Sequence, residues 1–134
     1  MDLMDYTWRV MEKDIEGLAQ RFKAVSRNIA HANTPGYERR NVSFEDELRK
    51  AINGGPKLKM TTTDPGHIPS QPLSVESVTP TETRIRDEIF RLDGNNVDPE
   101  REMAVLAETR MMYGAMSRFA ARKLSTYRTV IGGR

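Results

Sequence analysis

The sequence predicts a mainly α-helical protein whose long N- and C-terminal helices pair as an antiparallel coiled-coil hairpin, with an extended Pro-rich middle containing little β structure. Three observations carry this prediction. An apolar heptad stripe runs through the first part of the chain, a wider apolar arc runs through the last part, and five of the seven prolines fall within residues 53–97. We expect paired helices over 1–33 and 98–131 to form one core domain. Residues 34–97 should hold a turn, a short strand or helix, and an extended or mobile insert.

The first helix is predicted from a stripe that continues without a miss from Met4 to Ala32. It corresponds to about 43 Å of helix at 1.5 Å per residue, with a seam suited to one coiled-coil partner in the same subunit. Only Gly17 weakens the helix, by about 1 kcal/mol. The expected interface residues of this helix are Trp8, Met11, Ile15, Leu18, Phe22, Val25 and Ile29.

A turn should follow, because Pro35 cannot continue a helix and Pro35-Gly36 fits the central positions of a type II turn. Val42 and Phe44 then alternate as in a short strand, and the next residues can form a helical turn up to Ile52. Over 53–97 the apolar residues are too sparse for a core, so this part should be extended or mobile when isolated. Within it, 83–92 can form a strand or a short helix.

The second long helix has a strong predicted start, because Asp98 can cap it and Pro99 suits its first position. Gly132-Gly133 should end it. Its apolar arc is about 140° wide, which is more than one coiled-coil partner covers, so neighbouring subunits should cover the rest. The expected interface residues of this helix are Leu106, Met112, Tyr113, Met116, Phe119, Leu124, Tyr127 and Ile131.

Composition and charge argue against several functions. The formal net charge is only +2, which does not favour nucleic acid binding, and without cysteine there is no disulfide or thiolate metal site. His31 and His67 are far apart and have no acidic partners at metal or acid/base spacing. Residues 1–5 lead into no apolar segment, and no stretch is long enough to insert into a membrane. We therefore expect no enzyme activity, no cofactor, no small-molecule substrate, no nucleic acid partner and no cleaved signal peptide.

Patterning alone leaves two other interpretations open. The hairpin can belong to a small intramolecular bundle, although the Pro-rich middle supplies no further helices to complete one. Alternatively, the wide face of the second helix can serve as the groove of a small helical adaptor or chaperone-like binding module. Such a module would form a soluble, defined complex, whereas a self-assembling subunit would polymerise.

Two sequence blocks narrow the choice among these interpretations. The first is Ser26-Arg27-Asn28-Ile29-Ala30-His31-Ala32-Asn33-Thr34-Pro35-Gly36-Tyr37, and the second is Asp93-Gly94-Asn95-x-Val97-Asp98-x-Glu100-x-Glu102-Met103. Together they resemble the flagellar axial proteins, most closely the proximal-rod members, although His31 stands where Asn is usual. The family motif positions are Asn28, Ile29, Ala30, Asn33, Thr34, Pro35, Gly36, Tyr37, Asp93, Gly94, Asn95, Asp98, Glu102 and Met103.

This resemblance implies a structural subunit of the proximal rod, which transmits torque from the motor to the hook and filament. It implies export through the flagellar type III system and self-assembly in the periplasmic part of the basal body. The implied partners are copies of the chain itself, the rod proteins FlgC, FlgF and FlgG, and FliE with the MS ring and export gate.

Three motif residues invite specific roles. We expect Asn28 to make an inter-subunit hydrogen bond, because a buried polar group must be paired. Asn33 can cap the helix end or contact a subunit, and Tyr37 can close the turn or lie at an interface. The basic residues of the second helix either form a solvated face or meet acids on neighbouring N-terminal helices; they are Arg110, Arg118, Arg122, Lys123, Arg128 and Arg134.

Overall fold

The computed structural model describes residues 6–53, 74–86 and 91–133. Its elements, in chain order, are α1 (Tyr6–Ala30), β1 (Arg40–Ser43), α2 (Glu45–Ile52), the short 3-10 helix η1 (Val75–Ser77), β2 (Thr81–Arg84) and α3 (Pro99–Gly132). The described chain is mainly helical, as predicted, and β1 and β2 pair antiparallel with Arg40 opposite Arg84. Most of the Pro-rich insert, Met4 and Arg134 lie outside the described residues.

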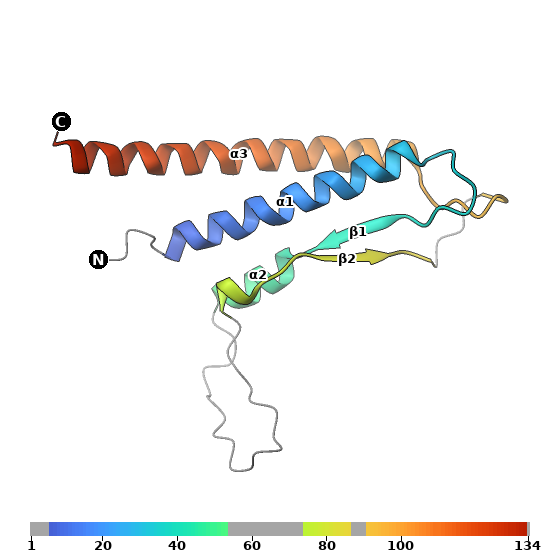
Figure 1. Ribbon diagram of the computed structural model, residues 1–134, viewed down its shortest axis with the longest axis horizontal. Helices are drawn as coiled ribbons and strands as arrows, with labels where there is room; N and C mark the ends of the chain where they lie inside the picture. Colours follow the sequence, from blue (N-terminus) through green and yellow to red (C-terminus); the bar gives the residue numbers. More distant parts are fainter. Residues whose placement is uncertain (1–5, 54–73, 87–90, 134) are drawn as a thin grey trace, which may run out of the picture.

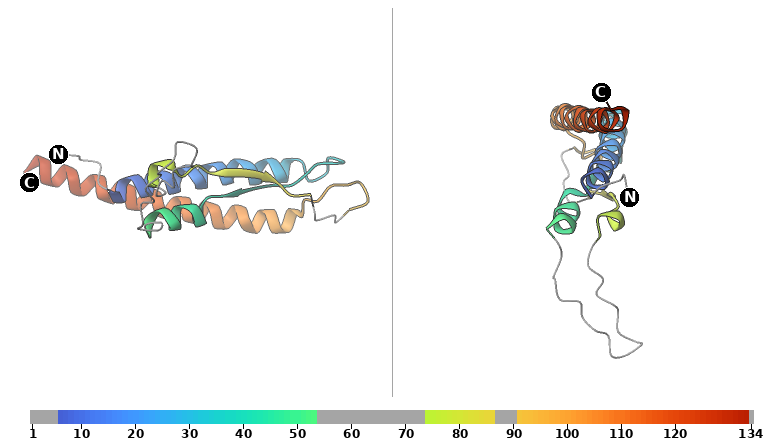
Figure 2. Two further views of the ribbon diagram at one scale, coloured as in Figure 1. Left: turned by 90° about the horizontal axis from the view of Figure 1, so that it is seen from below. Right: turned by 90° about the vertical axis from the view of Figure 1, so that its left-hand side faces the viewer.

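Helix α1 is the central layer of the molecule. Figure 1 shows α3 on one side of α1, and the β1–β2 sheet with α2 on the other. The further views agree with this order (Figure 2), and α1 contacts α3, β1, α2 and η1. Helices α1 and α3 run in opposite directions, lie closest near the loops, and spread apart toward the two termini (Figure 1). Their pairing as a coiled coil stays a prediction.

The predicted turn and the predicted ends of the second long helix are confirmed, whereas α1 ends at Ala30, three residues earlier than predicted. The Tyr37 amide donates to the Thr34 carbonyl across 3.3 Å, and Gly36 has a φ of +68°, as the third residue of a type II turn requires. The Asp98 carboxylate accepts from the Glu100 amide at 3.0 Å, so it caps the start of α3. Gly133 ends α3 in the left-handed region.

The main core lies between α1 and the sheet side of the molecule, and it corrects one prediction. Its buried members are Leu18, Ala24, Val42, Phe44, Leu48, Ala51, Val75 and Val78. Residues 53–97 were expected to be too poor in apolar residues to contribute a core, yet Val75 and Val78 are buried in it. They reach the core because η1 packs against α1 and α2. The strand or short helix expected over 83–92 overlaps β2 only at Thr83 and Arg84, and residues 87–90 of that range lie outside the described residues.

The heptad stripe of α1 divides into two rows with different surroundings. Met11, Leu18 and Val25 form a buried row, which continues to Ala32 after the helix end. In the other row, Trp8, Ile15 and Ile29 are half-buried and Phe22 is 44% exposed. The cause is that α1 has partners on two sides, so a single seam does not describe its contacts.

Candidate functional site

The two sequence motifs meet at the end of the molecule where α1 leads into β1 and β2 leads into α3 (Figure 1). Asn95 joins them. Its fully buried side-chain amide nitrogen lies 2.9, 3.1 and 2.8 Å from the carbonyl oxygens of His31, Ala32 and Thr34. These carbonyls follow the end of α1, where backbone acceptors have no partner within the helix. Asn95 therefore fixes the first motif onto the second.

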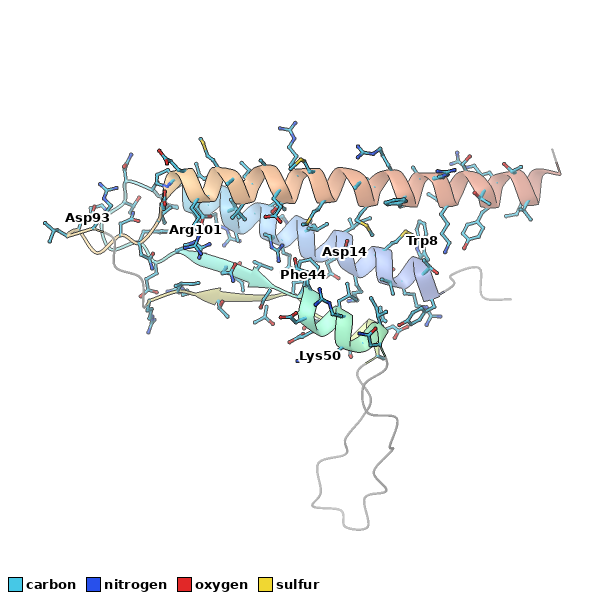
Figure 3. The ribbon with its side chains drawn as sticks, turned by 180° about the vertical axis from the view of Figure 1, so that it is seen from behind. Trp8, Asp14, Phe44, Lys50, Asp93 and Arg101 are labelled. Atoms are coloured by element: carbon cyan, nitrogen blue, oxygen red, sulfur yellow. The ribbon has the colours of Figure 1, made fainter. Side chains whose placement is uncertain are left out.

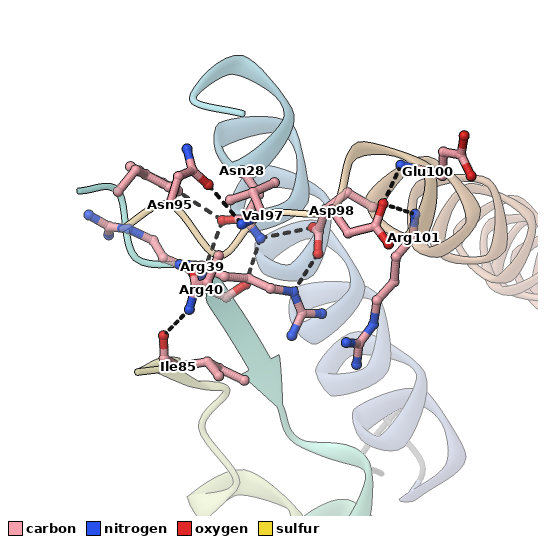
Figure 4. Close-up of polar contacts among 12 residues, drawn as sticks. Asn28, Arg39, Arg40, Ile85, Asn95, Val97, Asp98, Glu100 and Arg101 are labelled. Atoms are coloured by element: carbon pink, nitrogen blue, oxygen red, sulfur yellow. Dashed lines mark hydrogen bonds and ion pairs between the residues drawn. The ribbon is translucent and has the colours of Figure 1, made fainter. Parts of the chain in front are cut away.

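Asn28 is also fully buried, and its side chain makes the pair of backbone hydrogen bonds with Arg40 that a neighbouring strand would make (Figure 4). Its amide nitrogen donates to the Arg40 carbonyl at 2.8 Å, and its carbonyl oxygen accepts from the Arg40 amide at 3.0 Å. The same side chain donates to Glu102 at 2.9 Å and accepts from the Tyr37 hydroxyl at 3.2 Å. Because these four bonds use the full capacity of the amide, the expected inter-subunit hydrogen bond of Asn28 is wrong.

A buried ion pair completes this arrangement. The Arg39 guanidinium donates to the Glu102 carboxylate at 2.5 Å, with side-chain exposures of 8% and 0%. The Arg39 amide donates to Asn96, whose own side-chain amide donates to the Ile85 carbonyl, both at 2.6 Å (Figure 4). We call Asn28, Tyr37, Arg39, Asn95, Asn96 and Glu102 the motif clasp.

Sequence reasoning missed Arg39 and Asn96. Their neighbours in the chain carry no periodicity that signals burial, and an arginine in a loop is normally exposed. For Glu102 the only local signal was an acid in the first turn of a helix, which the helix dipole explains without burial. Only the meeting of the two motifs in space identifies the ion pair.

The remaining motif residues take different places. The Gly36 amide donates to the Asp93 carbonyl at 2.9 Å, and the Tyr37 ring stacks on the His31 ring with centroids 4.7 Å apart. Tyr37 therefore closes the turn. Asn33, Ala30, Thr34, Pro35 and Met103 are exposed, so they do not belong to the motif clasp, and Ile29 is half-buried.

Charged side chains fasten the sheet side to α1. Arg21 of α1 forms an ion pair with Glu45 at 2.5 Å and lies over the Phe44 ring. Burial raises the pKa of the nearby Asp14 carboxyl, and the Glu45 charge adds to this, while Arg21 opposes it. The hydrogen bond from Arg40 lowers the pKa of Glu82 despite partial desolvation. The ion pairs therefore have a structural role.

In contrast to the motif clasp, the apolar face of α3 is largely uncovered. Met112, Tyr113 and Leu124 are exposed, Phe119 is 60% exposed and Ile131 is 73% exposed. Leu106, Met116 and Tyr127 are half-buried, and within α3 only Glu102 and Thr109 are buried. Such a series of large apolar side chains along one helix is typical of an interaction surface.

Two further features bear on function. Arg110, Arg118, Arg122 and Arg128 of α3 are exposed, and none forms an ion pair within the described part of the chain. Among the same residues there is no group of three or more His, Asp or Glu that could hold a metal ion. None of the described helices is long and apolar enough to cross a membrane.

An end whose polar groups are paired within the subunit, together with a largely exposed apolar face on α3, is typical of a structural subunit that assembles with other chains. No family model matches the chain. The flagellar basal body rod protein FlgB of Escherichia coli K12 is 34% identical over 117 residues, covering 84% of this chain and 83% of that protein. FlgB of Salmonella typhimurium is 34% identical over 123 residues with the same coverage, and FlgB of Bacillus subtilis is 28% identical over 134 residues, covering 99% and 98%. The chain belongs to the FlgB family, so it is a structural component of the flagellar basal body rod.

Proposed function

We propose that the chain is a subunit of the proximal rod that transmits torque from the motor to the hook and filament, and that it is not an enzyme. One observation carries the proposal: in a member of a rod protein family, the apolar face of α3 is exposed over most of its length. Burying this face against neighbouring subunits would supply much of the free energy of assembly. An adaptor function would use the same face but has no support from the related proteins.

The family motif residues and both helix faces then have separate tasks. The motif clasp holds each subunit in one shape, while the stripe of α1 and the face of α3 pair as a coiled coil and pack against neighbours. The neighbours would be further copies and the rod proteins FlgC, FlgF and FlgG, with FliE, the MS ring and the export gate below. Export through the type III system without a cleaved signal would deliver the chain to the periplasmic rod.

Charge supports the same arrangement. The last part of the chain, 101–134, holds seven Lys or Arg against two Glu, whereas residues 1–24 hold five acids against four bases. The four exposed arginines of α3 that form no ion pair among the described residues would meet acids on neighbouring N-terminal helices. Electrostatic complementarity of this kind fixes the register of an assembly more than its affinity.

Substitutions on the face of α3 test the proposal. In cells that lack the native gene, Phe119→Asp and Leu124→Asp together should abolish swimming and remove the chain from isolated basal bodies. Ala121→Asp is the matched control, because Ala121 is exposed outside the predicted apolar arc of the same helix. Circular dichroism of the purified variants should show unchanged helix content. Normal swimming of the double variant would overturn the proposal.

A further inference from the structure

A groove between α1 and α3 lies away from the motif clasp. It measures about 400 Å³ and is lined by Ala19, Phe22 and Lys23 of α1 and by Arg110 and Tyr113 of α3. Phe22 is 44% exposed and Tyr113 is 42% exposed, so two aromatic side chains remain partly open to solvent. The groove thus combines an apolar lining with two cationic side chains.

Neither cation has a counter-ion in the described parts of the chain. Lys23 and Arg110 are both exposed, and no ion pair with an acid of residues 6–53, 74–86 or 91–133 involves them. A segment that fits this groove should present apolar side chains between carboxylates. The apolar part would cover the aromatic rings, and the carboxylates would pair with Lys23 and Arg110.

The chain itself contains such a segment. Residues 2–5 read Asp-Leu-Met-Asp, and no Lys or Arg occurs before Arg9. Two other acidic and apolar stretches fit less well. In 45–48, Leu48 is buried in the core and Glu45 is paired with Arg21. In 87–90, the two acids are flanked by Arg86 and Arg91, which would repel the cations of the groove.

Residues 2–5 cannot reach the groove of their own subunit. Phe22 lies about 24 Å along the axis of α1 from Tyr6 at 1.5 Å per residue. Leu3 is three residues before Tyr6, and an extended chain of that length spans at most about 11 Å. The segment can therefore fill the groove only of another copy.

We propose that residues 2–5 of one copy dock in the groove of Phe22 and Tyr113 of a second copy, with Asp2 and Asp5 paired to Lys23 and Arg110. This proposal rests on the proposed rod function and names one contact within it. The contact joins different surfaces of the two copies, so it is heterologous and can repeat along an open helical assembly.

Cross-linking tests the contact, because the chain has no cysteine of its own. Leu3→Cys and Ala19→Cys variants are expressed together in cells that lack the native gene, and isolated basal bodies are treated with a short bismaleimide. We expect a cross-linked dimer that neither variant gives alone. Leu3→Cys with Ala121→Cys is the matched control and should give none.

Charge reversal then tests the pairing. Adding Lys23→Glu and Arg110→Glu to the Ala19→Cys variant should lower the dimer yield several-fold, whereas Lys50→Glu, at an exposed cation of α2, should leave it unchanged. Basal bodies that contain both cysteine variants but give no dimer would overturn the docking proposal while leaving the rod function intact. Absence of the chain from basal bodies would overturn both. Equal dimer yields with the Ala121→Cys control would also overturn the docking proposal, because the cross-link would then not be specific to the groove.

Discussion

At the scale of single residues, Gly17 has a packing role that its helical position hides. A Cβ atom at position 17 would lie 2.6 Å from the Phe44 ring, which is buried and cannot move aside. Phe44 lies between α2 and α1 in Figure 3. The residue that weakens the predicted helix is therefore the residue that allows the sheet side to pack against it.

Gly17→Ala should destabilise the protein. Alanine adds up to about 1 kcal/mol of helix propensity, but overpacking against Phe44 costs about 1–3 kcal/mol. Gly114→Ala in α3 is the matched control, because its Cβ would meet only the Arg118 side chain, at 3.5 Å. Urea denaturation should therefore show a lower midpoint for Gly17→Ala and an unchanged or higher midpoint for Gly114→Ala. A higher midpoint for both would contradict this packing.

Asn28→Asp should be far more damaging than the same change at Asn33. The new carboxylate would face Glu102 in a fully buried site and would lose both donated hydrogen bonds, a cost of about 3 kcal/mol or more. Asn33 is exposed, so Asn33→Asp should stay within about 0.5 kcal/mol of the native chain. The free energies of unfolding from urea titrations decide this, and a small effect at Asn28 would argue against its role in the motif clasp.

At the scale of elements, α2 is joined to α1 by a cluster of three charges, Asp14, Arg21 and Glu45. Burial opposes ionisation of Glu45, but hydrogen bonds from Arg21 and the backbone prevail and lower its pKa. A lowered pKa contributes stability above the unfolded value near 4.3, and this is lost as the pH falls through the folded pKa. The raised pKa of Asp14 acts in the opposite direction, because its ionised form is disfavoured in the folded chain.

Two variants should separate these effects. Glu45→Gln should reduce the loss of stability as the pH falls below about 4.3, since one group with a lowered pKa is gone. Asp14→Asn should raise the denaturation midpoint at pH 7, because it removes a carboxylate whose charge burial disfavours. Thermal denaturation between pH 3 and pH 7 measures both. A steeper acid loss in Glu45→Gln would exclude the Arg21 pair as a source of stability.

The elements also show what sequence can predict. The bounds of α1 and α3, the turn at Gly36 and the cap at Asp98 follow from local chemistry, and they were predicted to within a few residues. The motif clasp was not predicted, because Asn28 and Glu102 are 74 residues apart in the sequence. Each becomes the hydrogen-bond partner of the other only when the fold brings them together. The same holds for Val75 and Val78, whose burial depends on where η1 packs.

At the scale of the whole molecule, the two ends differ in how much of their polar and apolar surface has a partner within the subunit. The motif clasp occupies one end, where polar groups are buried and paired. Toward the other end α1 and α3 diverge, and α3 continues beyond the start of α1 (Figure 1). An assembling subunit needs this division, because one end must hold its shape while the other offers surface to neighbours.

Amide hydrogen exchange should reveal the division directly. In the purified chain, amides of 102–116 lie beside α1 and near the motif clasp, so they should exchange only in openings close to global unfolding. None of residues 127–132 has a buried side chain, so their amides should exchange nearly as fast as in an unfolded peptide. In isolated basal bodies the second segment should become protected, since neighbours would then cover Ile131 and the residues around it. Uniform protection along α3 in the purified chain would mean that its end is already stable without neighbours, and the division between the two ends would then be wrong.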